Sequence, residues 1–401
     1  MKVALLTREY PPHVYGGAGV HVEYLTRELA RLDDLAVHCW GDERPASADG
    51  GPQVVAHRPW DALAGRAPHR AALQAVSVDL TMAAGVQGAD IVHSHTWYAN
   101  LGGHLAKLLY DVPHVATVHS LEPLRPWKAE QLGGGYALSS FCERTALEAA
   151  DALIAVSEGM RADLLSAYSA IDPERVEVIY NGVDVDEYKP DSGKDVLERH
   201  GLDPDAQSVV FIGRITHQKG VPYLLEAALA FDPAAQLVLC AGSPDTPEIG
   251  AEVARRVQQL REQRGNVIWL DQMLRRREVI QLLSHATVFV CPSIYEPLGI
   301  VNLEAMACEA AVVATATGGI VEVVEDGITG LLVPVELSQD EAGAPRDPSE
   351  FAAAIAERVN HLVTDPSRAA EMGRAGRRRV TDRFAWPVIA AQTSALYRRL
   401  A

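Results

Sequence analysis

The sequence predicts an α/β protein built from two doubly wound parallel sheets, one in each half of the chain. Short apolar runs typical of buried strands alternate with longer helical patterns from one end to the other. The length of 401 residues exceeds what one ordinary core holds, and 48% hydrophobic with 22% charged residues is typical of a folded globular chain. Two large domains therefore fit the sequence best.

The first half contains six strand candidates separated by helical segments. They are residues 3–6, 36–39, 91–93, 114–117, 152–156 and 176–179. The clearest helical pattern covers residues 20–32, where Val22, Leu25, Leu29 and Leu32 recur every three or four positions. This order of elements predicts a first parallel sheet with helices on both faces.

The second half repeats this alternation. Its strand candidates are residues 209–212, 236–241, 267–270, 288–291, 311–314 and 330–333. A polar segment with Pro and Gly, residues 181–207, separates the two halves and is predicted to be the junction. We therefore expect a first domain over residues 1–183 and a second over residues 184–385, followed by a terminal helix over residues 386–401.

Charge, targeting signals and cysteines restrict the class of protein. The balance of 36 Lys and Arg against 53 Asp and Glu gives a net charge of −17, which disfavours a nucleic-acid partner. The apolar run at the N-terminus is too short for a signal peptide, and no apolar stretch approaches the length of a membrane span. The five cysteines stand singly, without CxxC pairs, so we expect reduced thiols and a cytoplasmic location.

A glycine-rich turn follows the first predicted strand. Gly16, Gly17 and Gly19 precede the helix over residues 20–32, where a doubly wound domain presents backbone N–H groups to a ligand. The third glycine of the dinucleotide fingerprint is missing, and no acid ends a strand about twenty residues later. An ordinary strand-to-helix turn explains the segment equally well.

Two cations follow the first strand of the second half. Arg214 and Lys219 lie where a parallel strand ends and a helix begins, a position from which they would neutralise a diphosphate leaving group without a metal. A solvated pair of loop charges is the alternative. The position of the pair at the strand end favours a diphosphate-binding site.

Residues 293–307 are the most informative segment. They follow a predicted strand and bring the exposed acid Glu296, the backbone amides of Leu298 and Gly299, and then a helix that begins near Ile300. Glu296 and Glu304 are eight residues apart, which on a helix is on the order of 12 Å. Glycosidase carboxylates lie closer together, so we expect these two acids to hold opposite ends of one elongated ligand.

Histidines also end two strands of the first half. His119 follows residues 114–117, and His93 and His95 end the strand before it. No acid or cysteine nearby completes a ligand set with the latter two, so we expect no metal site. Asp184 and Asp186 form an acid-x-acid pair that could hold a divalent ion. A turn after residue 182 explains the pair equally well.

These motifs together resemble a known group of enzymes. The segment from Glu296 to Glu304 resembles the acid-x7-acid motif of retaining glycosyltransferases with the two-Rossmann GT-B architecture, and Arg214 with Lys219 resembles their donor-diphosphate clamp. Residues 6–12, 92–98 and 120–128 are similar to the actinobacterial glycogen-synthase-like enzymes of glycosyltransferase family 4, which include the α-maltose-1-phosphate synthases. The resemblance covers essentially the whole chain. It implies an inter-domain cleft and a terminal helix that crosses back to the first domain.

The resemblance also implies roles for individual residues toward an ADP-glucose donor. Arg214 and Lys219 would bind the diphosphate, and Glu304 would bind the ribose. Glu296 would bind the transferred glucose, together with Tyr295 in the same turn. Leu298 and Gly299 would offer amides to the β-phosphate, and His119 would contact the sugar or the reaction centre. Glu9 and the Gly16–Gly17 loop would close the site from the first domain. No metal or other cofactor is implied.

The acceptor implied by the resemblance is glucose-1-phosphate. Glucan-elongating synthases carry Lys immediately ahead of the paired glycines, whereas this chain has Tyr15, so the enzymes with a short acceptor match better. Arg125 and Lys128 are candidates for the acceptor phosphate, with His95 nearby, although solvated loop charges explain both cations as well. A glucan-elongating synthase, a UDP-glucose donor, a non-catalytic sugar-nucleotide-binding protein and a homodimer all remain open at this stage.

Overall fold

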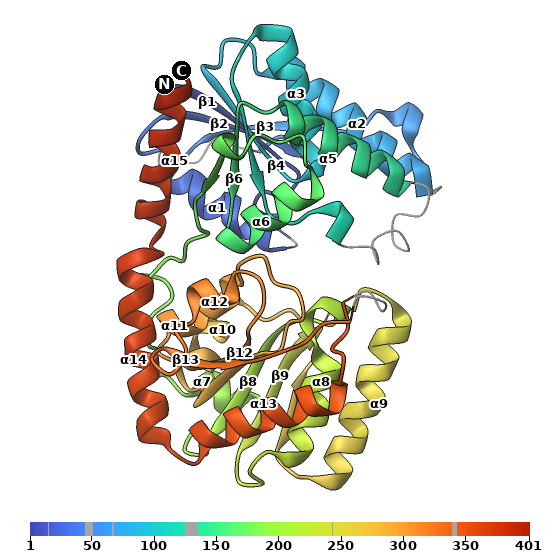
Figure 1. The fold of residues 1–401 in the computed structure, drawn as a ribbon. Coiled ribbons are helices and arrows are strands. Elements are labelled where there is room, and N and C mark those ends of the chain that lie inside the picture. The colour runs from blue at the N-terminus through green and yellow to red at the C-terminus, as the bar shows by residue number, and fades with distance from the viewer. Residues whose placement is uncertain (15, 45–50, 66–67, 125–134, 243, 339–342) are drawn as a thin grey trace. The chain divides into compact units, whose positions relative to one another are not determined.

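The computed structural model describes the 401-residue chain except for residues 15, 45–50, 66–67, 125–134, 243 and 339–342. The chain divides into two compact units, drawn in Figure 1. The N-terminal unit contains Met1–Gly182 and Trp386–Ala401, and the C-terminal unit contains Val183–Ala385. The terminal helix therefore belongs to the N-terminal unit, as the resemblance implied.

The N-terminal unit is built on a seven-stranded parallel sheet in the order β3-β2-β1-β4-β5-β6-β7. Its strands are β1 (Lys2–Thr7), β2 (Asp34–Trp40), β3 (Gln53–His57), β4 (Ile91–His95), β5 (His114–Val118), β6 (Ala152–Ala155) and β7 (Val176–Val178). The six predicted strands are confirmed. The sequence did not indicate β3, because this edge strand pairs on one side only and its residues are mostly half-buried.

Helices cover both faces of this sheet. They are α1 (Gly17–Leu29), α2 (Pro68–Gly85), α3 (Trp97–Tyr110), α5 (Tyr136–Ala149), α6 (Glu158–Ala167) and α15 (Trp386–Leu400), with short 3₁₀ turns at Asp61–Leu63, Glu122–Leu124 and Pro173–Arg175. Successive side chains of a strand point to opposite faces. Val3 and Leu5 therefore pack with α1 and α15, whereas Ala4 and Leu6 pack with α2 and α3.

The first helix is displaced from its predicted position. Helix α1 runs over Gly17–Leu29, three residues earlier at each end than the predicted 20–32. The backbone N–H groups of Leu32 and Asp33 both bond to the carbonyl of Leu29, which closes a turn before β2. Leu32 lies in this turn and is 45% exposed, so it matches the helical spacing without joining the core.

The C-terminal unit contains a six-stranded parallel sheet in the order β10-β9-β8-β11-β12-β13. Its strands are β8 (Ser208–Arg214), β9 (Gln236–Gly242), β10 (Val267–Leu270), β11 (Val288–Cys291), β12 (Ala311–Thr315) and β13 (Gly330–Val333). All six correspond to predicted strands. The near-continuous burial of β9, β11 and β12 is typical of a parallel sheet covered on both faces.

The helices of this unit pack on both faces of its sheet. They are α7 (Asp195–Arg199), α8 (Val221–Ala227), α9 (Pro247–Gln263), α10 (Arg276–Ser284), α11 (Ile300–Ala307), α12 (Ile320–Val323), α13 (Pro348–Val363) and α14 (Pro366–Arg383), with 3₁₀ turns at His217–Lys219 and Ala228–Ala230. Val209 and Phe211 of β8 share one core with residues of α8, α9 and α13. Helices α11 and α14 pack against each other, and α14 also contacts β12 and β13.

Most of the segment predicted to be a junction is folded onto the C-terminal unit. Residues 183–207 include α7, whose Val196 and Leu197 are buried. The backbone N–H of Val196 donates to Oε1 of Gln281 in α10, 2.7 Å away. The polar composition of this segment therefore reflects its hydrogen bonding to α10, and the change of unit is confined to Gly182 and Val183.

The five cysteines, all within the described residues, are buried free thiols. Within the described segments, no helix combines the length and the apolar composition that a membrane crossing requires.

Candidate active site

Each sheet has one point where the strand order reverses, and the predicted site residues follow the strands at these points. The order reverses between β1 and β4 in the N-terminal unit and between β8 and β11 in the C-terminal unit. In doubly wound sheets, ligands bind beyond the carboxyl ends of the two strands at such a switch point. Each unit therefore has one candidate ligand site of its own.

In the C-terminal unit, the loops after β8 and β11 bring Lys219 to Glu296. The Nζ of Lys219 donates to Oε2 of Glu296 at 2.5 Å, and the hydroxyl of Ser293 donates to the same oxygen at 3.2 Å. Gly220 permits this approach: its φ is +64°, and a Cβ there would lie 2.0 Å from the carbonyl oxygen of Pro292. The turn carrying Lys219 therefore packs directly on the chain after β11.

The Lys219 ammonium keeps its charge in this site. Burial alone would lower the pKa of Lys219, but the Glu296 carboxylate offsets that effect, and the net result is a pKa above the usual value. An ammonium has three N–H donors, and the bond to Glu296 uses one. The remaining donors fit an anionic ligand.

Arg214 lies close to this pair, at the end of β8. Its Nη1 donates to Oδ1 of Asp245 at 3.0 Å, and both side chains are partly exposed. The positive charge of Arg214 acts to lower the pKa of Lys219, which places the two cations within electrostatic range of each other. Sequence reasoning missed Asp245, although its position shortly after β9, beside the switch point, could have indicated it.

The turn after β11 presents a helix N-terminus beside the ion pair. Helix α11 begins at Ile300, as predicted, and Gly299 caps it with φ of +90°. A Cβ on Gly299 would lie 2.5 Å from Nδ2 of Asn302, so only glycine fits there. The backbone amides of Leu298 and Gly299 stand at this positive end of the helix dipole, a favourable place for phosphate.

Asn302 is a second residue that the sequence did not single out. Its side chain is fully buried, and neither polar atom has a hydrogen-bond partner among the described residues. It lines a small cavity together with Lys219, Ser293 and Glu296. Because an apolar helical run surrounds it, no periodicity in the sequence could have revealed this buried carboxamide.

Glu304 belongs to a separate cluster of charged groups on the same unit. Burial raises the pKa of Glu304 to about 7, opposed by a hydrogen bond from Tyr188 and by the charge of Arg276. Arg276 in turn pairs with Glu187 at 3.2 Å. Glu304 is therefore only partly ionised at neutral pH, whereas Glu296 is held against a cation. Tyr295, next to Glu296, is half-buried.

In the N-terminal unit, the glycine turn is closed by Glu9. The backbone N–H of Gly16 donates to Oε2 of Glu9 at 2.8 Å. A Cβ on Gly19 would lie 2.6 Å from the same oxygen, so the carboxylate packs against the first turn of α1, while Gly17 is exposed. The Glu9 carboxylate therefore occupies the position at the N-terminus of α1 where the sequence predicted that a ligand would bind.

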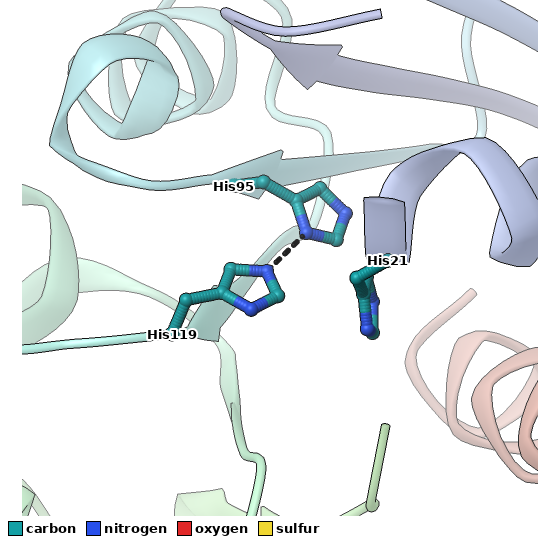
Figure 2. A group of neighbouring side chains, drawn as sticks. All are labelled: His21, His95 and His119. Atoms are coloured by element: carbon teal, nitrogen blue, oxygen red, sulfur yellow. Dashed lines mark hydrogen bonds between the residues drawn. The ribbon is translucent and has the colours of Figure 1, made fainter. Parts of the chain in front are cut away.

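Three histidines of the N-terminal unit gather beyond β4 and β5 (Figure 2). The Nδ1 of His95 lies 3.0 Å from Nε2 of His119, and the ring of His21 from α1 lies 4.7 Å from that of His119. Burial lowers the pKa of His21 to about 4 and holds the pKa of His95 and His119 well below the usual value. All three are neutral at pH 7.

The other predicted histidine and the acidic pair have structural partners. The two ring nitrogens of His93 lie 2.6 Å from the hydroxyl of Tyr397 and 2.7 Å from that of Thr117, so His93 joins α15 to the sheet. Oδ1 of Asp184 accepts from the backbone N–H of Asp186 at 3.1 Å, which forms a turn. The acceptor candidates Arg125 and Lys128, and Tyr15 of the glycine turn, lie outside the described residues.

Comparison with known proteins identifies the family. The model of Glycosyltransferase Family 4 matches residues 15–187, and the model of Glycosyl transferases group 1 matches residues 194–379. The chain is 56% identical to an alpha-maltose-1-phosphate synthase of Mycolicibacterium smegmatis and 52% identical to one of Mycobacterium tuberculosis strain H37Rv, with all of each chain covered. The chain belongs to glycosyltransferase family 4. It is a glycosyltransferase, and the resemblance noted from its motifs is confirmed.

Solved structures agree on the fold of this family 4 glycosyltransferase. A sucrose-phosphate synthase from Thermosynechococcus elongatus is 26% identical, has a TM-score of 0.80, and matches over 99% of this chain and 98% of its own. An Anabaena protein crystallised with UDP and glucose is 21% identical, has a TM-score of 0.78, and matches over the whole of both chains. Two Rossmann-like domains with parallel sheets, the GT-B architecture, are thus confirmed.

Proposed function

We propose that this glycosyltransferase moves glucose, with retention of configuration, from ADP-glucose to glucose-1-phosphate and so forms α-maltose-1-phosphate for α-glucan (glycogen) synthesis. Support comes from the full-length identity above 50% to two proteins named alpha-maltose-1-phosphate synthase. The observation that carries the proposal is the pairing of Lys219 with Glu296 beside the N-terminus of α11. That arrangement sets a cation and phosphate-binding amides beside an acceptor for sugar hydroxyls.

The proposed reaction exchanges one bond at the anomeric carbon. The bond from that carbon to the β-phosphate oxygen breaks, and ADP leaves with the electron pair. A bond forms to the O4 oxygen of glucose-1-phosphate, whose hydroxyl proton is released. Negative charge grows on the departing diphosphate, so fixed cations that strengthen their interaction with it lower the barrier.

In this proposal, cationic and acidic residues bind different parts of the ADP-glucose donor. Lys219 and Arg214 neutralise the diphosphate, and the amides of Leu298 and Gly299 bind the β-phosphate at the start of α11. Glu296 accepts hydrogen bonds from the transferred glucose, and Glu304 from the ribose. Since two cations already compensate the diphosphate, the proposed reaction uses no metal.

The N-terminal unit supplies the remaining contacts in this proposal. His119 contacts the sugar, and Glu9 with the Gly16–Gly17 turn borders the donor. Arg125 and Lys128 pair with the phosphate of the acceptor, with His95 close by. We place the enzyme in the cytoplasm, a location that the buried free thiols support.

A two-acceptor assay tests this function. The protein is incubated with radiolabelled ADP-glucose and either glucose-1-phosphate or glycogen, and the products are separated by size and charge. We expect a small phosphorylated disaccharide from the first mixture and little label in the polymer. Label mainly in glycogen would instead identify a glucan-elongating synthase. Donor binding without transfer to either acceptor would identify a non-catalytic sugar-nucleotide-binding protein. Repeating the assay with UDP-glucose measures the donor preference.

A further inference from the structure

The histidine cluster of the N-terminal unit has properties that the transfer reaction does not use. His21 extends from α1, His95 ends β4 and His119 follows β5, and Figure 2 shows the ring of His21 beside the hydrogen-bonded pair of the other two. One ligand nitrogen from each ring lies within 4.8 Å of the others. Three segments far apart in the sequence therefore bring three imidazoles to one point.

Two nitrogens in this cluster lack partners despite being buried. The side chains of His21 and His95 belong to residues that are 2% and 0% exposed, and Nε2 of each has no hydrogen-bond partner among the described residues. Buried polar atoms are nearly always paired, so such atoms require an explanation. His93, next to them in the sheet, has both ring nitrogens hydrogen bonded. Nδ1 of His104 and Nδ1 of His114 also lack partners, but among the described residues only His21, His95 and His119 are grouped closely enough to hold one ion.

The hydrogen bond between His21 and Asn181 prepares one of these nitrogens for a metal. Nδ1 of His21 lies 2.6 Å from Oδ1 of Asn181, a buried residue. An N–H donated to this oxygen places the proton on Nδ1 and leaves the lone pair on Nε2. Metal-binding histidines characteristically have such a partner on the nitrogen that does not bind the metal.

We propose that His21, His95 and His119 bind a zinc ion. Three neutral imidazoles with a fourth position left for water are a known zinc ligand set. Zinc–nitrogen bonds of about 2.0–2.1 Å require ligand nitrogens roughly 3.4 Å apart, so nitrogens that lie within 4.8 Å of one another must approach by up to about 1.4 Å.

The chemistry of the cluster favours zinc over other occupants. Mg²⁺ and Ca²⁺ prefer oxygen ligands, whereas imidazole suits zinc and its neighbours in the transition series. A sugar hydroxyl cannot reach Nε2 of His21, a residue that is 2% exposed. A small ion can enter past His119, the half-buried member of the three.

Zinc at this site would be an inhibitor and not a cofactor, a consequence that depends on the proposed function. There His119 contacts the sugar, and a metal-bound His119 has one ring nitrogen fewer for that contact. The binding of zinc itself is independent of the substrate and of the reaction. A failure of the metal site is therefore distinguishable from a failure of the proposed function.

Metal titration of the untagged, EDTA-treated protein tests the site. We expect one Zn²⁺ per chain by calorimetry, and Co²⁺ in its place should show the visible absorption of a tetrahedral nitrogen-bound ion. His21→Gln and His95→Gln should each weaken binding at least tenfold. His57→Gln, which removes a buried histidine of the same unit, and His69→Gln, which removes an exposed one, should leave binding unchanged.

Variants of Asn181 give a second test that keeps all three ligands. Asn181→Leu should weaken zinc binding by about 10–100-fold, and Asn181→Asp should tighten it, since a carboxylate makes the imidazole a stronger ligand. Thermal melting of each metal-free variant shows that it is folded. The proposal is overturned if the wild-type protein binds no zinc, or if zinc binds equally well to the folded His21 and Asn181 variants.

Discussion

The ammonium of Lys219 and the carboxylate of Glu296 lie 2.5 Å apart although 77 residues separate them in the chain. Their side chains are 22% and 9% exposed, so the pair is largely withdrawn from water, and Glu296 is not the exposed acid that the sequence predicted. Removing one member of such a pair leaves the other charge buried without compensation, which is costly. The pair thus contributes both to the stability of the fold and to the proposed donor site.

Lys219→Ala should lower kcat by about 100–1,000-fold, because the departing diphosphate loses a fixed cation whose attraction grows in the transition state. Steady-state kinetics with ADP-glucose and glucose-1-phosphate measure this. Lys194→Ala is a matched control: Lys194 lies in the same unit, pairs with Asp205 at 2.9 Å and is 47% exposed. Equal losses in the two variants would contradict the proposed role.

Glu304→Gln should stabilise the ligand-free protein more at pH 8 than at pH 4. Burial raises the pKa of Glu304 to about 7, so the folded state retains a proton that the unfolded state releases above pH 4.5. The wild-type protein therefore loses stability as the pH rises from 4.5 through 7, and glutamine removes this loss. Melting temperatures at the two pH values test it. Glu357→Gln, on the exposed face of α13, should show no such difference.

The N-terminal unit should lose stability in acid between pH 6.5 and about 4. Burial lowers the pKa of His21 and His38 to about 4 and of His114 to about 3. Between these pH values the unfolded state binds protons that the folded state does not bind. The free energy of unfolding therefore falls by about 1.4 kcal/mol per pH unit for each histidine. Urea unfolding in EDTA at pH 7, 6 and 5 measures the slope. A stability that stays constant over this range would contradict the buried, neutral state of these rings.

Lys128→Ala should raise KM for glucose-1-phosphate and leave KM for ADP-glucose unchanged. The proposed function assigns this cation to the acceptor phosphate, so its loss affects only the substrate that carries that phosphate. Initial rates with each substrate varied in turn separate the two constants. Unchanged acceptor kinetics would remove Lys128 from the site, and a parallel rise in both constants would indicate a general loss of structure.

Zinc should inhibit the transfer reaction, and His21→Gln should relieve the inhibition. The zinc site includes His119, which the proposed function places against the sugar, whereas His21 belongs to the metal site alone. The rate of each variant with added Zn²⁺ is compared with its own rate in EDTA. The same zinc sensitivity in the wild-type and His21→Gln proteins would mean that inhibition arises elsewhere.

The sequence by itself determined the two parallel sheets, because buried strands and amphipathic helices leave local periodic patterns. The runs at 267–270, 288–291 and 330–333 coincide with β10, β11 and β13, whereas the edge strand β3, partly exposed, left no such pattern. The sequence also placed Glu296 and His119 beyond strand ends, whereas Arg214 is the last residue of β8; the carboxyl ends of parallel strands share one edge.

Only the tertiary structure decided which of these groups meet. The contacts of Lys219 with Glu296 and of His21 with His95 and His119 form between segments distant in the chain, so no local spacing encodes them. Burial, which makes His21 neutral and leaves Glu304 half-protonated near pH 7, likewise depends on packing around each side chain. The charge state and the contacts of a residue depend on which side chains surround it, and only the folded chain specifies those side chains.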